Sequence, residues 1–213
     1  MRSRPSPRTS PPGYAVRRAA VALVALLLTL TACGGESEAS GELTGTVLDP
    51  PFGVSSTPLT DTTGAPYSLT EDTDKDLTLV FFGYIHCPDI CQTVMSSLAT
   101  AMTRLDERDR ERVEVVYVTT DPARDTEQAI REYLDHLDPE FVGLTGELDR
   151  IVEVAKPLGV GITQGERLPS GGYDVTHGAT ITGIDAEDRG TIYWSESTSS
   201  AEFAADIHTL LND

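Results

Sequence analysis

Cys87 and Cys91 are the residues of this sequence whose type and spacing could do chemistry most directly. They lie in the stretch FFGYIHCPDICQTV, where an apolar β-like run stops at a turn with a proline and an amphipathic helix follows. The C-x-x-x-C spacing is one helical turn, so the two sulfurs can converge on one metal ion or close into a small disulfide ring. A helix N-terminus carries partial positive charge, which lowers the pKa of a thiol. The sequence therefore predicts a reactive or metal-ligating thiol pair.

A structural disulfide between Cys87 and Cys91 is the alternative interpretation. Closing a loop of about five residues stabilises a protein by about 2 kcal/mol in the chain-entropy model. A domain of roughly 170 residues can build a sufficient core without that gain. Asp89, between the two cysteines, either supplies negative charge to the thiol pair or serves as a turn-forming acid.

A histidine could complete a metal site, because two thiolates bind copper(I) linearly and a neutral imidazole adds a trigonal site that also tolerates copper(II). His208 within a helix and His136 at a helix end are expected to be surface or capping residues. His86 directly precedes Cys87 and points to another side, so it is more a modifier of thiol pKa than a ligand. His177 lies between a long polar loop and a strand, where sites of parallel α/β folds gather at the edge of the sheet. It is the favoured third ligand, with a structural loop histidine as the alternative.

These residues have to be positioned by a chain in which strands and helices alternate. Apolar residues at helical spacing and β-branched apolar runs distinguish the two kinds of element. The pattern predicts an α/β sheet with helices on both faces, preceded by a β-hairpin over residues 57–70. Two capping boxes, one starting at Asp125 and one at Ser199, mark helix starts. Strands are expected at 77–83, 112–121, 141–144 and, as a pair, 179–194, helices at 91–105, 125–135, 147–157 and from 200, and a Gly-rich polar loop at 161–176.

The N-terminal region has the pattern of an export signal. Residues 1–32 combine five arginines and no acid with the apolar run AAVALVALLLTL, which is short for a membrane span. The sequence LTAC ending at Cys33 resembles the lipobox of bacterial lipoproteins, whose cysteine is lipidated; an ordinary cleavage site with a free Cys33 is the alternative. Residues 33–42 are small and polar and predict a flexible tether, and the folded domain is expected at 43–213. We expect a lipid-anchored protein at the extracytoplasmic face of the cell membrane, exported by general secretion.

Strong acidity limits the possible partners. Without residues 1–32 the chain keeps 34 acidic against 11 basic residues, a net charge of −23. Nucleic acid and anionic lipid head groups are therefore poor partners, and cations or basic protein surfaces are favoured. Simple solubility at high ionic strength explains the same acidity.

Three motifs in this order resemble the Sco/SenC family of proteins. They are FFGYIHCPDIC around the thiols, TTDPARDT after the next strand, and YDVTHGATITGID around His177. The resemblance covers most of residues 43–213 and implies a thioredoxin-like fold with Cys87, Cys91 and His177 as copper ligands. The family commonly has Asp before this histidine, where Thr176 stands here, so a carboxylate that would support the ligand is missing.

The same resemblance implies a function for the chain. It indicates a copper metallochaperone that carries copper(I) or copper(II) to the CuA centre of cytochrome c oxidase, with the oxidase subunit that holds CuA as partner. A thiol-disulfide oxidoreductase that reduces the CuA cysteines through Cys87 and Cys91 is the alternative. A peroxiredoxin-like peroxidase is disfavoured because no Thr-x-x-Cys element is present.

Overall fold

Strand β4 (Leu77–Gly83) lies at the centre of the sheet, and all seven of its residues are buried. The computed structural model describes residues 42–88, 90–167 and 173–212. Strand β4 pairs in parallel with β5 (Val113–Thr119) and antiparallel with β9 (Ile181–Asp185). A strand with neighbours on both edges and side chains packed on both faces is apolar throughout, as LTLVFFG is. The mixed sheet has the order β1-β10-β9-β4-β5-β6-β2-β3, with β1 at Thr46–Gly53, β2 at Leu59–Asp61, β3 at Pro66–Tyr67, β6 at Val142–Thr145 and β10 at Arg189–Trp194.

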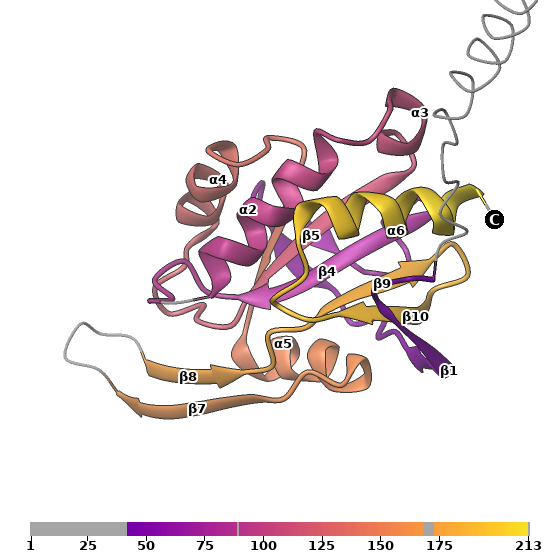
Figure 1. Ribbon diagram of the computed structural model, residues 1–213. Coiled ribbons are helices and arrows are strands. Elements are labelled where there is room, and N and C mark those ends of the chain that lie inside the picture. The colour runs from indigo at the N-terminus through magenta and orange to yellow at the C-terminus, as the bar shows by residue number, and fades with distance from the viewer. Residues whose placement is uncertain (1–41, 89, 168–172, 213) are drawn as a thin grey trace, which may run out of the picture. The chain divides into compact units, whose positions relative to one another are not determined.

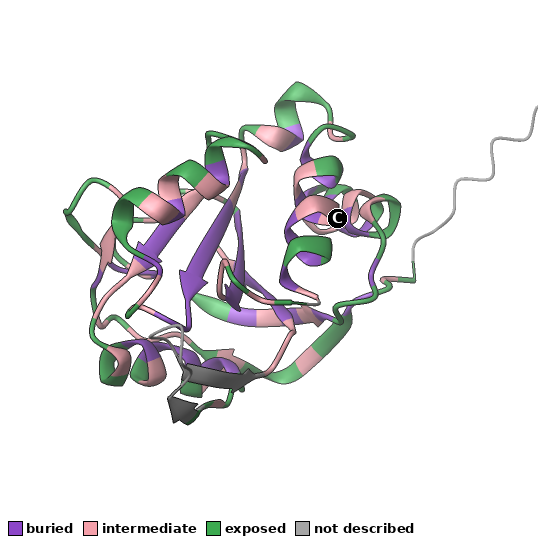
Figure 2. Ribbon diagram, turned by 90° about the vertical axis from the view of Figure 1, so that its left-hand side faces the viewer, coloured by how far each residue is buried: buried purple, intermediate pink, exposed green. Residues whose placement is uncertain are grey.

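Helices cover both faces of this sheet (Figure 1). On one face α2 (Cys91–Met102), α4 (Glu127–Asp135) and α6 (Ser200–Asn212) pack in one apolar cluster with residues of β4 and β5. On the other face α5 (Leu148–Ala155) packs against the opposite side chains of the same strands. Figure 2 shows the buried strands enclosed between the partly exposed helices. A short helix α3 (Glu107–Arg110) and a 3-10 turn (Lys156–Leu158) complete the helical elements described.

The predicted fold class is confirmed, as are the strand at 77–83, the N-terminal hairpin of β2 and β3, and the final hairpin of β9 and β10. The predicted capping box at Ser199 is also present. The Ser199 hydroxyl accepts from the Glu202 N–H at 3.3 Å, and the Glu202 carboxylate accepts from the Ser199 N–H at 2.8 Å. Strand β1 and helix α3 were not expected from the sequence.

Three predicted details are wrong. Thr126, not Asp125, caps α4, with its hydroxyl accepting from the Ala129 N–H at 3.2 Å. The buried face of α5 includes Val154 rather than Val152. The segment 161–176 is not a plain loop, because β7 (Ile162–Arg167) and β8 (Tyr173–His177) pair antiparallel in a separate two-stranded sheet.

The predicted signal peptide at 1–32, Cys33 and the tether up to residue 41 lie outside the described residues. In the part of the chain that the structure describes, no helix combines the length and the apolar character needed to cross a bilayer.

Candidate functional site

The two thiols lie at the junction that follows β4. The N–H of Cys87 donates to the carbonyl of Tyr84 at 3.1 Å and closes the turn formed by residues 84–87, the thiol turn. Cys91 is the first residue of α2, after Ile90, whose side chain makes no capping hydrogen bond. Cys87 is half-buried and Cys91 is 2% exposed, and the two are thiols that are not joined in a disulfide. The structure therefore presents one accessible and one buried sulfur side by side.

The electrostatics of Cys91 differ from the sequence expectation. Burial, and then a hydrogen bond with the Cys87 sulfur, raise the pKa of Cys91 from 9.0 to about 12. The expected lowering by the helix N-terminus is wrong for this thiol, because loss of hydration in the apolar core outweighs the partial charge of the helix. Cys91 therefore keeps its proton at neutral pH until a cation or a reaction partner displaces it.

Aromatic rings and a glycine form the wall behind Cys91. A Cβ placed on Gly83 would meet the Cys91 sulfur at 3.2 Å and the Tyr117 ring at 3.3 Å. The ring of Tyr117 stacks at a tilt on that of Tyr133, with centroids 5.6 Å apart. The Tyr117 hydroxyl is fully buried without a hydrogen-bond partner among the described residues, and burial raises the pKa of this hydroxyl well above its usual value. This apolar wall is the physical reason that a neutral thiol is favoured at Cys91.

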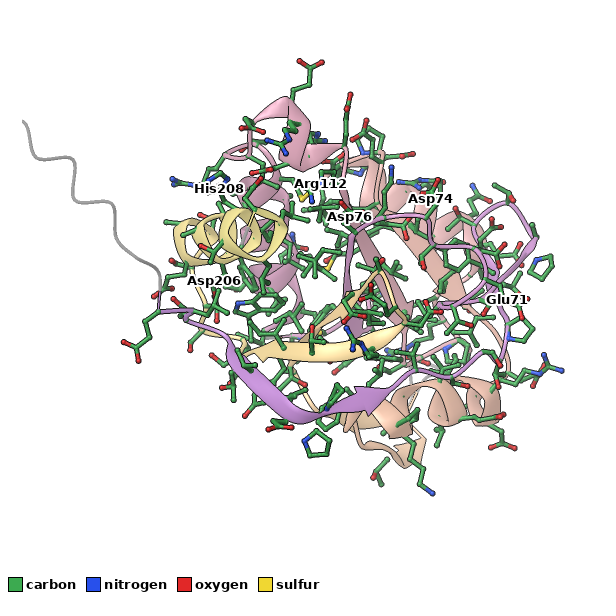
Figure 3. The ribbon with its side chains drawn as sticks, turned by 90° about the vertical axis from the view of Figure 1, so that its right-hand side faces the viewer. Glu71, Asp74, Asp76, Arg112, Asp206 and His208 are labelled. Carbon is green, nitrogen blue, oxygen red and sulfur yellow. The ribbon has the colours of Figure 1, made fainter. Side chains whose placement is uncertain are left out.

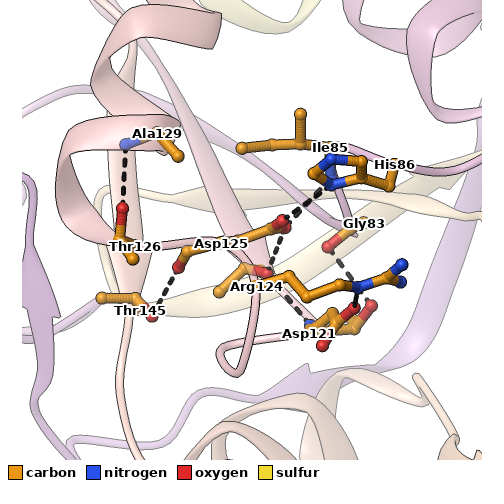
Figure 4. Close-up of polar contacts among 11 residues, drawn as sticks. Gly83, Ile85, His86, Asp121, Arg124, Asp125, Thr126, Ala129 and Thr145 are labelled. Carbon is orange, nitrogen blue, oxygen red and sulfur yellow. Dashed lines mark hydrogen bonds and ion pairs between the residues drawn. The ribbon is translucent and has the colours of Figure 1, made fainter. Parts of the chain in front are cut away.

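Asp125 is a site residue that sequence reasoning missed, because its position suggested a helix cap. Its side chain is fully buried, and one carboxylate oxygen accepts from the Ile85 N–H at 3.0 Å and from the Thr119 hydroxyl at 2.7 Å (Figure 4). Burial raises the pKa of Asp125, and these two donors partly offset the rise. Parallel β4 and β5 end at the same edge of the sheet, so an acid shortly after β5 could have been expected beside the thiol turn.

The backbone of His177 lies at that same edge. His177 is the last residue of β8 and is paired with Ile162, and Ile181, four residues later, lies opposite Phe81 of β4. Four residues span at most about 14 Å, so the topology brings the His177 backbone toward the end of β4, where the thiol turn begins. The side chain of His177 lies outside the described part of the structure. Figure 1 shows β8 reaching the end of the sheet at which α2 starts.

The other three histidines have separate surroundings. His86 has its Nδ1 3.7 Å from Asp125, on the thiol turn itself. His136 ends α4, with its Nδ1 2.6 Å from the carbonyl of Glu132, as expected for a capping residue. His208 of α6, labelled in Figure 3, has its Nδ1 2.5 Å from the buried Asp109 carboxylate. His136 and His208 are therefore structural.

Two further candidates cannot be placed. Asp89 and Cys33 lie outside the described residues. Where side chains are described, no three His, Cys, Asp or Glu residues converge as metal ligands do. The side chain of His177 is not part of that set.

The fold and the site define a thioredoxin-like α/β protein with a C-x-x-x-C dithiol at the start of a helix. The chain belongs to the SCO1/SenC family, whose model matches residues 52–212. It is 35% identical over 136 residues to a putative copper-binding protein of Stutzerimonas stutzeri, covering 63% of this chain and 66% of that protein. The chain spans 66%, 43% and 30% of the length of three of the curated relatives that it matches.

Solved structures agree with this family. Apo Sco1 of Thermus thermophilus superposes with a TM-score of 0.73 at 32% identity, covering 81% of this chain and 99% of that structure. ScoI of Arabidopsis thaliana with copper bound gives a TM-score of 0.67 at 26% identity, covering 74% and 97%.

Proposed function

We propose that this protein is a copper metallochaperone in which Cys87, Cys91 and His177 hold the copper ion. The observation that carries the proposal is the pair of adjacent thiols at the start of α2, at the sheet edge toward which the His177 backbone leads. Two thiols and one imidazole are the soft and intermediate donors that copper prefers. A family relative with copper bound supports the same cargo.

Transfer proceeds by exchange of ligands. Thiolate or imidazole groups of an acceptor replace those of the carrier one at a time, so the copper ion is never released to water. When copper leaves Cys91, the high pKa of that buried thiol makes it take up a proton again. An acceptor thiol that loses its own proton on binding copper can supply that proton, so charge is conserved across the exchange.

The acceptor in this proposal is the CuA site of cytochrome c oxidase. Sco proteins are described as a family of cytochrome c oxidase assembly proteins. The lipidated Cys33 would hold the domain at the extracytoplasmic face of the membrane, and residues 33–42 would let it reach the oxidase. The acidity of the chain favours a basic surface on the partner and disfavours nucleic acid.

Competition with a copper(I) chelator tests the ligand assignment. The reduced parent protein is expected to retain one copper ion. The copper affinity is expected to fall by at least about 100-fold in each of three variants, Cys87→Ser, Cys91→Ser and His177→Ala. Loss of a residue that only orients a ligand already lowers metal affinity by about 10–100-fold, and loss of the ligand itself should cost more. His136→Ala is the matched control, because this histidine caps α4 and should leave binding unchanged. If His177→Ala binds copper(I) and copper(II) as the parent does, the third ligand is misassigned.

A thiol-disulfide reductase acting on the CuA cysteines is the second candidate, favoured by the unequal exposure of the two sulfurs. The accessible Cys87 would attack the target disulfide, and Cys91 would then displace the reduced target and form the Cys87–Cys91 disulfide, two electrons having passed to the target. Reduction of an oxidised CuA domain by reduced protein that retains no copper, at one target disulfide per Cys87–Cys91 dithiol, would favour this candidate over the carrier.

A further inference from the structure

We propose that Asp125 is the positioning residue of the thiol pair: from the turn after β5 its buried carboxylate fastens the Ile85 backbone and thereby fixes Cys87 against Cys91. The proposal concerns the same two thiols as the proposed function, but it requires no metal. Asp125 belongs to the TTDPARDT motif, so the proposal assigns this motif a structural role at the thiol pair.

The anchor is a single buried oxygen with two donors. Asp125 Oδ2 accepts from the Ile85 N–H at 3.0 Å and from the Thr119 hydroxyl at 2.7 Å, and the Asp125 side chain is completely shielded from solvent. Asp125 Oδ1 makes no hydrogen bond within the described residues and lies 3.7 Å from His86 Nδ1. The carboxylate thus spans the end of β5 and the two residues that precede Cys87.

Two other residues of the turn after β5, Thr120 and Arg124, contact Gly83 and Tyr84, which precede Ile85 in the chain. The Thr120 N–H donates to the carbonyl of Gly83 at 2.7 Å, and the Thr120 hydroxyl donates to it at 3.2 Å. The Arg124 guanidinium lies over the ring of Tyr84, 5.9 Å from its centroid, and also pairs with Asp121. The turn after β5 therefore contacts every residue from Gly83 to His86, as the contacts around Gly83, Ile85 and His86 in Figure 4 illustrate.

The two thiols differ in how their positions are set. Cys91 belongs to α2 and to the apolar cluster, so helix packing fixes its sulfur. Cys87 lies on the turn that begins at Tyr84, and Asp125 fastens the middle of this turn at Ile85. Loss of the Asp125 carboxylate is expected to let Cys87 sample more positions relative to Cys91. The effective concentration of the Cys87 sulfur near the Cys91 sulfur is then lower.

Equilibration of the metal-free protein with glutathione measures that effective concentration. Two thiols and one glutathione disulfide give the Cys87–Cys91 disulfide and two glutathione thiols, so each protein sulfur is oxidised as the glutathione S–S bond is reduced. Asp125→Ala is expected to lower the equilibrium constant for this oxidation about tenfold. Asp125→Asn keeps an oxygen that can accept both hydrogen bonds, so its equilibrium constant should fall by about threefold or less.

Asp138→Ala is the matched control for a buried carboxylate. Asp138 is 7% exposed, accepts from the Glu140 N–H at 3.0 Å and pairs with Arg110 at 2.7 Å. It precedes β6, at the sheet edge opposite the thiol turn, so its loss should lower the melting temperature without changing the equilibrium constant. Thr119→Val removes one of the two donors to Asp125 and should lower the constant, which keeps the proposal testable if Asp125→Ala does not fold.

Equilibrium constants within twofold of the parent for Asp125→Ala, or for Thr119→Val where Asp125→Ala does not fold, would overturn the proposal. An equal fall in Asp138→Ala would also overturn it, since general destabilisation would then explain the effect. The copper proposal fails by a different measurement, namely if the reduced parent protein does not retain copper against the chelator.

Discussion

Gly83 and Cys91 are in such close contact that a Cβ on the glycine would lie 3.2 Å from the Cys91 sulfur. The same Cβ would lie 2.8 Å from the ring of Phe81, a distance that real Cβ atoms hardly ever show. The absence of a side chain on Gly83, the last residue of β4, therefore makes room for the buried Cys91 sulfur.

Gly83→Ala is expected to destabilise the protein by about 1–3 kcal/mol, because the added methyl group has to displace buried rings. It should also move the Cys91 sulfur and weaken binding of a soft metal. Urea unfolding and chelator competition measure the two effects. Gly53→Ala is the control, since a Cβ there meets no atom within 4 Å, and both measurements should stay at the parent values.

Alkaline pH is expected to destabilise the folded state through Cys91. Burial raises the pKa of this thiol to about 12, whereas in the unfolded chain it ionises near 9.0. The contribution of Cys91 to stability is therefore fully present below about pH 9 and is lost as pH rises toward 12, with a slope of at most about 1.4 kcal/mol per pH unit. Other groups titrate in this range, so the measurement is the difference in unfolding free energy between the parent and Cys91→Ala. A difference that does not change with pH would contradict the assignment.

Asp206 fastens the start of the domain to α6. Its buried carboxylate accepts from the Thr44 N–H at 3.0 Å, the Gly45 N–H at 2.8 Å and the Trp194 indole N–H at 2.7 Å. Figure 3 labels Asp206 on α6. Asp206→Ala leaves these donors without an acceptor and should lower the free energy of unfolding by roughly 2–5 kcal/mol. The exposed Glu196 provides the control, and Glu196→Ala should change stability by less than about 0.5 kcal/mol.

Cys33→Ala is expected to release the protein from the membrane if the lipobox assignment is correct. Cell fractionation with an antibody to the domain, together with mass spectrometry of the mature N-terminus, measures the anchor directly. Membrane retention of the variant, with an unlipidated parent, would show that residues 1–32 act in another way. The Cys87–Cys91 glutathione equilibrium should be the same in both proteins, because the anchor takes no part in it.

Much of the fold follows from local patterns in the sequence. The run LTLVFFG is apolar at every position, which only a strand covered on both faces tolerates, and β4 begins and ends where this run does. Ser199 and Glu202 form the capping box that their spacing predicts, because both partners lie within one turn of the helix. The placement of Cys87 and Cys91 at the start of a helix was predictable for the same reason.

Other properties of the site depend on residues that are distant in sequence. Asp125 has the spacing of a helix cap, yet its carboxylate accepts hydrogen bonds from Ile85 of the thiol turn and from Thr119 of β5. The segment 161–176 has no strong strand pattern and becomes a hairpin through pairing of β7 with β8.

The sequence by itself determined strand β4, the capping box at Ser199, the thiol pair and its place at a helix start, because these depend on neighbours within one turn or one strand. Tertiary structure alone decided the raised pKa of Cys91 and the contacts of Asp125 with the thiol turn. Both depend on how much water the surrounding elements exclude and on which donors they bring close, and segments far apart in the chain supply those elements.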